Sequence, residues 1–254
     1  MSSRALYRAI TLNGVAAEEN LQAFELGRVA AHEGGQFAAP TTTPETMPLE
    51  DLIAHRAGEL TAYQNRAYAD RYLATIGRIQ ATPGASEALA RAAAVNLYKL
   101  MAYKDEYEVA RLYTDGRFAS ALAGTFSGGK VKVWLAPPLI AAKGPDGRPR
   151  KMAFGGWMLK AAFPILARLK GLRGGPFDFF GATAERRLER RLIADYEADL
   201  ARIAAELTPA RLRLAERIAA APDAIRGFGY IKEAAAALAA KARDGLWKEW
   251  EAVA

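Results

Sequence analysis

Residues 49 to 80 read LEDLIAHRAGELTAYQNRAYADRYLATIGRIQ, and this stretch decides what kind of fold to expect. Its apolar side chains recur every three or four residues, which is the spacing of an amphipathic helix rather than of a strand. The recurring positions are Leu49, Leu52, Ile53, Ala57, Leu60, Tyr63, Ala67, Tyr68, Tyr72, Ile76 and Ile79. The pattern predicts one long helix, or two helices in line, ending before Pro83 and Gly84.

Helical patterns continue on both sides of this stretch. Upstream, residues 15–32 are alanine-rich with spaced apolar side chains, and residues 36–48 hold three prolines and four threonines. Proline and threonine in that density are typical of a linker, so a domain boundary is expected there. Downstream, Ser86 is the expected N-cap of a helical run that continues into residues 98–116.

The carboxyl third is also predicted to be helical. Thr183 is an expected N-cap, and Glu185 in the first turn favours a helix start there. The apolar face of this helix is formed by Leu188, Leu192, Tyr196, Leu200, Ile203 and Leu207. A threonine followed by Pro209 predicts the start of another helix that ends at Pro222. A glycine-rich turn at 227–229 precedes a last helix.

One segment in the middle has the period of a strand. KVKVWLAPP at 130–138 alternates apolar and polar side chains and is stopped by two prolines. GPDGRP then predicts a turn, and KMAFGGW supplies a returning strand. We therefore expect a mainly α protein with a small hairpin-like β insertion, a multi-helix α+β domain over 49–254 with short strands around 130–155.

Composition excludes several kinds of chemistry. The 254 residues include no cysteine, so disulfides, thiolate nucleophiles, cysteine-type zinc sites and cysteine-held iron–sulfur clusters are absent from this chain. Only His32 and His55 are histidines, and no metal site is predicted from them. Neither a signal-peptide core nor an apolar run of about 18 residues is present, so we expect a cytoplasmic protein without a membrane partner.

The positive charge is concentrated in one segment. Residues 141–175 carry eight basic residues and one acid, Asp146, so this segment alone accounts for the net charge of +7. In the rest of the chain, basic and acidic residues are equal in number. The basic residues are Lys143, Arg148, Arg150, Lys151, Lys160, Arg168, Lys170 and Arg173. Such a segment suits a phosphorylated cofactor, an acidic partner surface or nucleic acid, and it is equally compatible with a solvated loop. Regularly interleaved aromatic residues, which single-strand binders use, are missing, so nucleic acid is disfavoured.

Two short motifs look catalytic but have simpler explanations. Residues 98–116, YKLMAYKDEYEVARLYTDG, offer carboxylates beside Lys104 and Arg111. On a helix, however, Glu108 lies one turn from both cations, and such pairs stabilise a helix by about 0.2 to 0.5 kcal/mol each. The glycine-rich 124–130 matches phosphate-loop spacing, but Val131 stands where a hydroxyl must reach magnesium, so a glycine turn is favoured.

Several blocks together resemble a known family. They are LYRAITLNGVAAEENLQAFELGRVAAHE, LTAYQNRAYADRY, LYKLMAYKDEYEVARLYTDG, LAPPL followed by GRPRKMAFGGWMLKA, ARLKGLRGGPFDFFGATAERRLER, and IRGFGYIKEA. In this order they are similar to the C-terminal region of the long, fused bacterial indolepyruvate ferredoxin oxidoreductases. The resemblance covers nearly the whole chain. Residues 1–35 resemble the terminal helices of the gamma-type domain, and residues 49–254, after the linker at 36–48, resemble the uncharacterised domain that follows it.

The resemblance implies an activity for a larger assembly. That family oxidatively decarboxylates indolepyruvate or another aryl 2-oxoacid to an acyl-coenzyme A and passes electrons to ferredoxin. Thiamine diphosphate, magnesium and iron–sulfur clusters do this work in other domains, which would be the partners of this chain. The chain itself is expected to have a structural or access-shaping role, with no cofactor of its own. A self-standing anion- or nucleic-acid-binding helical module using residues 143–173 is the alternative.

Two sets of candidate residues follow. The phosphates of coenzyme A would be bound by basic side chains, because guanidinium and ammonium groups suit phosphate oxygens. These candidates are Arg148, Arg150, Lys151, Lys170 and Arg173. Candidates for contact with the active site of the assembly are Tyr103, Lys104 and Arg111. The chain departs from the family pattern at Tyr230, where histidine is usual, and at Phe177 and Phe179, so no role of that histidine carries over.

Overall fold

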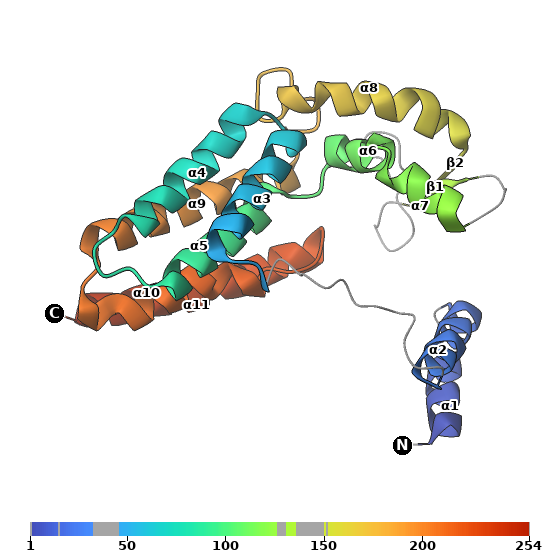
Figure 1. Ribbon diagram of the computed structural model, residues 1–254, viewed down its shortest axis with the longest axis horizontal. Coiled ribbons are helices and arrows are strands. Elements are labelled where there is room, and N and C mark those ends of the chain that lie inside the picture. The colour runs from blue at the N-terminus through green and yellow to red at the C-terminus, as the bar shows by residue number, and fades with distance from the viewer. Residues whose placement is uncertain are drawn as a thin grey trace. The chain divides into compact units, whose positions relative to one another are not determined.

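The computed structural model describes residues 2–14, 16–32, 46–125, 131–135, 150 and 152–253. These residues are mainly helical, and the sheet among them is a two-stranded antiparallel hairpin, which confirms the predicted fold class. The chain divides into two compact units, Met1–Met47 and Pro48–Ala254. Figure 1 shows the helices of both units.

The elements follow one another in this order. Before the hairpin lie α1 (Ser3–Asn13), α2 (Ala17–His32), α3 (Leu49–Tyr63), α4 (Arg66–Gln80), α5 (Glu87–Met101), α6 (Glu106–Thr114) and α7 (Arg117–Thr125). The hairpin and the helices next to it are β1 (Val133–Leu135), β2 (Met152–Phe154), the π-helix η2 (Met158–Ala162), α8 (Phe163–Arg168) and the 3₁₀ helix η3 (Leu169–Leu172). The carboxyl part contains α9 (Ala184–Glu206), η4 (Pro209–Arg211), α10 (Leu212–Ala220), η5 (Ala221–Ala224) and α11 (Tyr230–Ala252).

The amino-terminal unit is a pair of helices joined by a short turn. Ser2 caps α1, and Gly14, with φ of +67°, ends it in the left-handed conformation that glycine adopts without strain. The Tyr7 ring meets the Phe24 ring edge to face at 5.3 Å, and Arg28 donates a hydrogen bond to the Tyr7 hydroxyl at 3.0 Å. These contacts hold α1 against α2.

The second unit has α5 at the centre of its larger core. This helix packs against α3, α4, α9 and α10, so apolar residues are needed on most of its circumference. Its buried positions are Leu89, Ala90, Ala93, Ala94, Asn96, Leu97, Leu100 and Met101. The one polar member, Asn96, donates a hydrogen bond to the carbonyl of Ala219 at 3.1 Å, which ties α5 to α10.

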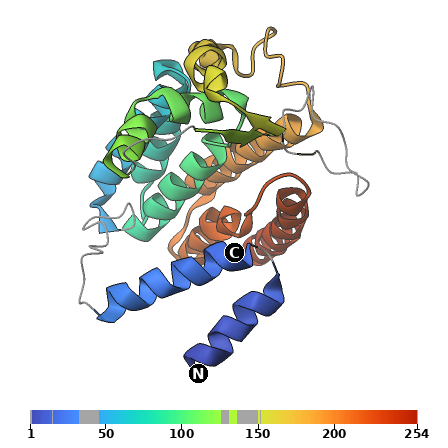
Figure 2. The same cartoon turned by 90° about the vertical axis from the view of Figure 1, so that its right-hand side faces the viewer.

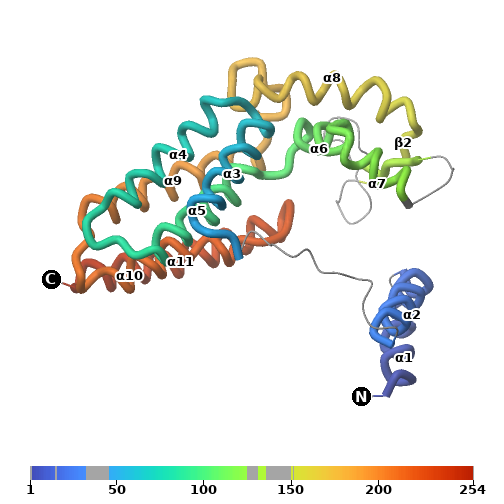
Figure 3. The backbone as a smooth tube through the Cα atoms, in the orientation of Figure 1, coloured from blue at the N-terminus to red at the C-terminus, as the bar shows by residue number. Residues whose placement is uncertain are grey.

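The expectation of one long helix, or two in line, over residues 49–80 was wrong. The stretch forms α3 and α4, which pack against each other, and Figure 3 shows the chain reversing between them. The reversal falls at Gln64 and Asn65; the backbone of Asn65 is extended, and its side chain accepts the Tyr68 N–H at 2.9 Å. An asparagine N-cap restarts the helix in a new direction, and periodicity alone does not record such a restart.

The predicted helical run through residues 98–116 is also interrupted. α5 ends at Met101 and α6 begins at Glu106, with Asp105 as its N-cap. Lys104 lies in the connection, so the predicted helical pair between Lys104 and Glu108 was wrong. The pair between Glu108 and Arg111 is confirmed, with a shortest distance of 2.6 Å between Oε1 and Nη2.

A smaller core lies in a lobe formed by α6, α7, the hairpin, η2 and α8. α8 runs beside α6 (Figures 1 and 2), and the buried residues of the smaller core are Ala110, Val133, Met158 and Phe163. In the hairpin, Val133 pairs with Phe154 and Trp134 pairs with Ala153. Alternation places Val133 in the core and Trp134 outside. Among the described helices, none is long and apolar enough to cross a membrane.

Candidate functional site

A buried ion pair joins the larger core to the lobe. The side chains of Arg173, after η3, and Asp105, before α6, are only 2% and 3% exposed. Asp105 accepts two hydrogen bonds from the guanidinium, at 2.5 Å from Nε and 2.8 Å from Nη2. The third donor, Nη1, reaches the carbonyl of Tyr63 at 2.7 Å. A bidentate pair of this kind is both strong and directional. We call Tyr63, Asp105, Tyr107, Arg173 and Asp178 the Arg173 joint.

Basic side chains at the Arg173 joint also donate hydrogen bonds to the carbonyls at the end of α3. The last carbonyls of a helix have no partner within it, and cations at that end are favoured by the helix dipole. Lys170 donates to the carbonyl of Ala62, Arg173 donates to that of Tyr63, and Gln64 donates back to the carbonyl of Arg173 at 3.2 Å. Figure 3 shows the segment after α8 passing this end of α3. Burial lowers the pKa of Lys170 below its ordinary value.

Tyrosine rings surround the guanidinium. The Arg173 guanidinium carbon lies 3.6 Å from the centre of the Tyr63 ring and 5.5 Å from that of Tyr107. The Tyr63 hydroxyl donates to the carbonyl of Tyr103 at 2.9 Å. Burial raises the pKa of Tyr63 and of Tyr103, with the negative charge of Asp105 adding to it. These phenols are therefore neutral and act as packing and hydrogen-bonding groups, not as bases.

Asp178 holds the loop that carries Arg173. Its carboxylate accepts the Tyr107 hydroxyl at 3.3 Å, the Gly174 N–H at 2.8 Å and the Gly181 N–H at 3.0 Å. A Cβ atom at Gly181 would lie 2.4 Å from Asp178 Oδ2, so any side chain at this position would displace the Asp178 carboxylate. Burial and the nearby Asp178 carboxylate raise the pKa of Tyr107 to about 12.

Further ion pairs extend from the joint towards α9 and α11. The closest atoms of Glu106 and Arg186 are 3.7 Å apart, and burial raises the pKa of Glu106 despite this cation. Lys232 at the start of α11 lies 2.6 Å from Glu189 on α9. The start of α9 is therefore bound electrostatically both to α6 and to α11.

The structure gives the three predicted contact residues different surroundings. Tyr103 is buried and packs edge-on against Tyr63 at 6.0 Å. Lys104 is exposed, with its ammonium 5.0 Å from the centre of the Phe228 ring. Arg111 is held by Glu108 and lies 3.6 Å from Asp115. The three side chains thus have three separate sets of partners.

The five predicted phosphate-binding residues are also separated. Lys170 donates to the carbonyl of Ala62, and Arg173 binds Asp105 and the carbonyl of Tyr63. Arg150 is exposed, whereas Arg148 and Lys151 lie outside the described residues, as does most of the glycine-rich stretch 124–130. Sequence reasoning missed Asp178 altogether. Its one signal was an acid inside the glycine-rich stretch GGPFDFFG.

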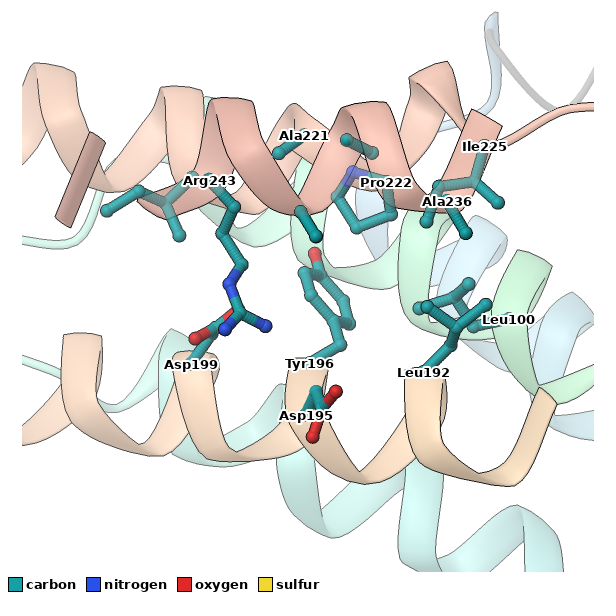
Figure 4. A pocket seen from close by; sticks show the side chains of 13 residues that line it. Leu100, Leu192, Asp195, Tyr196, Asp199, Ala221, Pro222, Ile225, Ala236 and Arg243 are labelled. Atoms are coloured by element: carbon teal, nitrogen blue, oxygen red, sulfur yellow. The ribbon is translucent and has the colours of Figure 1, made fainter. Parts of the chain in front are cut away.

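A small cavity of about 60 Å³ lies in the larger core, between α9, η5 and α11 (Figure 4). It is lined by Leu100, Leu192, Asp195, Tyr196, Asp199, Ile218, Ala221, Pro222, Ile225, Ala236, Ala239, Ala240 and Arg243. At one end Arg243 lies 3.6 Å from Asp199, which also accepts the Trp247 indole N–H at 3.0 Å. Burial raises the pKa of Asp199 to about 6. In the described part of the chain no cluster of three or more acidic or histidine side chains is placed to hold a metal ion.

Asp199 is expected to make stability depend on pH. Its pKa of about 6 in the folded chain exceeds the ordinary value of 3.8, so the stability it contributes is present below 3.8 and is lost as the pH rises through 6. Urea unfolding should therefore show the wild type losing stability relative to Asp199→Asn as the pH rises from 3.8 to about 6. Glu233→Gln, which changes an exposed acid on α11, is the control. Parallel pH curves for wild type and Asp199→Asn would refute the expectation.

Fold and site together define a mainly helical protein whose second unit is held by buried ion pairs and carries a strongly basic segment. The chain belongs to the family described as a family of unknown function, DUF6537, which matches residues 49–245. The match begins at the first residue of α3 and ends within α11. Neither the curated proteins nor the solved structures include a match to this chain.

Proposed function

We propose that this chain is a component of a 2-oxoacid ferredoxin oxidoreductase that acts on indolepyruvate or another aryl 2-oxoacid. In this proposal the assembly oxidatively decarboxylates the 2-oxoacid to an acyl-coenzyme A. Thiamine diphosphate, magnesium and the iron–sulfur clusters are held by partner domains. The chain supports those domains and shapes access to them, without a redox centre of its own.

The observation that carries the proposal is that the sequence blocks which resemble the oxidoreductase family contact one another in the structure. The blocks at 60–72, 97–116 and 167–190 supply Tyr63, Asp105 and Arg173, which are in direct contact. The block at 225–234 supplies Lys232, which pairs with Glu189 of the third block. Segments far apart in the sequence thus contact one another in the fold. This supports the interpretation that the blocks resemble the family as one domain and not as separate short matches. The absence of cysteine in all 254 residues agrees with a role that holds no cluster.

The proposal is tested by reconstitution. The chain is purified and mixed with the thiamine- and cluster-bearing component encoded with it, and coenzyme A-dependent reduction of ferredoxin by indolepyruvate is measured with and without the chain. Co-elution in a fixed ratio, together with a change in turnover, is expected. The absence of both co-elution and any change in turnover would overturn the proposal.

A role in coenzyme A binding forms part of the proposal and has its own test. The triple replacement of Arg148, Arg150 and Lys151 by alanine is expected to raise the KM for coenzyme A at least about tenfold, since a factor of ten corresponds to about 1.4 kcal/mol of lost binding. Lys241→Ala, an exposed cation on α11, is the control and should leave this KM unchanged. An unchanged KM in the triple variant removes coenzyme A binding from the proposal and leaves the rest standing.

A further inference from the structure

The outer side of η2, α8 and η3 carries an apolar stripe. Trp157, Ile165 and Leu169 are 60%, 58% and 38% exposed, and Ala161 is exposed between them. These positions are four residues apart. Because η2 is a π-helix and α8 an α-helix, a four-residue step keeps approximately to one side of the segment. The opposite side is fixed in the smaller core by Met158 and Phe163.

Two cations each directly precede a residue of the stripe, one before Ala161 and one before Leu169. Lys160 and Arg168 are exposed, and neither forms an ion pair or a hydrogen bond with any other residue that the structure describes. In the sequence from 150 to 177 there is no acid at all. Lys170 and Arg173, in contrast, bind inward to α3 and Asp105, so they add little to the surface. We call Trp157, Lys160, Ala161, Ile165, Arg168 and Leu169 the α8 face.

We propose that the α8 face is the docking surface for an acidic, amphipathic helix of the thiamine- and cluster-bearing component. This inference rests on the proposed function and names the surface and the chemistry of the contact. An apolar row on the partner helix packs on Trp157, Ile165 and Leu169, and carboxylates beside that row pair with Lys160 and Arg168. Exposed tryptophan and arginine are the residue types that most often dominate the energy of such interfaces.

Other occupants fit the α8 face less well. Lys160 and Arg168 are eight residues apart, which is roughly 12 Å along a helix, too far to close on one phosphate. The aliphatic Ile165 and Leu169 give nucleic-acid bases no ring to stack on. Binding to a lipid surface requires a broad apolar face on the helix. This stripe is only one side chain wide, and one of its four positions is an alanine. An extended acidic helix matches both the length of the stripe and the spacing of its charges.

The test uses the chain and the thiamine- and cluster-bearing component, with their dissociation constant measured by calorimetry at two salt concentrations. Ile165→Glu places a negative charge in the stripe and is expected to weaken binding at least about 100-fold. Lys160→Glu combined with Arg168→Glu should weaken it at least about tenfold and flatten its salt dependence. Leu238→Glu, which alters an equally exposed side chain on α11, should stay within about twofold of the wild type.

The outcomes separate this inference from the proposed function. If the wild type neither binds the component nor changes its turnover, both are overturned. If it binds and the α8 variants bind as well as Leu238→Glu, only the α8 face is overturned.

Vesicles of phosphatidylcholine with phosphatidylglycerol, and oligothymidylate, are tested in parallel. Binding of either one to the wild type, lost in the same variants while the protein complex is unchanged, would assign the α8 face to lipid or nucleic acid and overturn the inference. Circular dichroism checks that each variant is folded.

Discussion

Arg173→Met is expected to lower the free energy of unfolding by about 3 to 5 kcal/mol, since removing one partner of a buried ion pair leaves the other charge without compensation. Asp105 would remain in a site where its side chain is 3% exposed. The carbonyl of Tyr63 at the end of α3 would lose its donor as well. Urea unfolding at pH 7, followed by circular dichroism, measures the difference.

Two further variants make this result specific. Arg168→Met removes an exposed guanidinium only five residues away, and its free energy of unfolding should stay within about 0.5 kcal/mol of the wild type. Adding Asp105→Asn to Arg173→Met removes both charges but keeps a good N-cap for α6, and part of the lost stability should return. Equal stabilities for Arg173→Met and Arg168→Met would show that the buried ion pair does not hold the lobe to the larger core.

Trp250→Ala is expected to lower the free energy of unfolding by about 3 to 5 kcal/mol, the usual range for truncating a buried tryptophan. Trp250 has no exposed surface, and its ring meets that of Trp247 at 5.3 Å. Its indole N–H donates to Glu206 at 2.9 Å, and the Arg211 guanidinium lies 5.1 Å from the ring centre. The substitution therefore opens a cavity where α11 meets the end of α9. Thermal and urea unfolding both report the loss.

The chain contains its own control for this substitution. Trp134, at the centre of β1, is 64% exposed, so Trp134→Ala should change the free energy of unfolding by no more than about 0.5 kcal/mol. A large loss for Trp134→Ala, or a small one for Trp250→Ala, would contradict the assignment of Trp250 to the larger core. Both variants remove the same number of atoms, so the difference between their free energies of unfolding measures the contribution of burying the tryptophan side chain.

Local patterns predicted most of the helices and the hairpin. Thr183 and Ser86 cap their helices as expected, accepting the N–H groups of Arg186 and Leu89. The alternation in KVKVWL predicted a strand, and Val133 is indeed buried while Trp134 is exposed. These features depend on side chains within a few residues of one another, which is why sequence alone contains them.

The error in residues 98–116 occurred where a distant residue contributes to the outcome. The break before α6 is occupied by Asp105, which caps the helix and binds Arg173, a residue 68 positions away. Periodicity through 98–116 is satisfied equally well with or without that break. In the same way, nothing local to Lys170 and Arg173 shows that the end of α3 lies beside them. Their charge alone suggested phosphate ligands, and the structure adds internal partners that the sequence pattern does not reveal.

The Arg173 joint has a consequence for the order in which the chain acquires its structure during synthesis. Tyr63 and Arg173 are 110 residues apart, and Asn96 contacts the carbonyl of Ala219 across 123 residues. Contacts between such distant residues form slowly, because a long loop has to close first. A ribosome making about 5 to 20 residues per second needs at least several seconds to travel from Tyr63 to Arg173. Throughout that interval Asp105 lacks its Arg173 partner, and α5 exposes the apolar sides that α9 and α10 later cover.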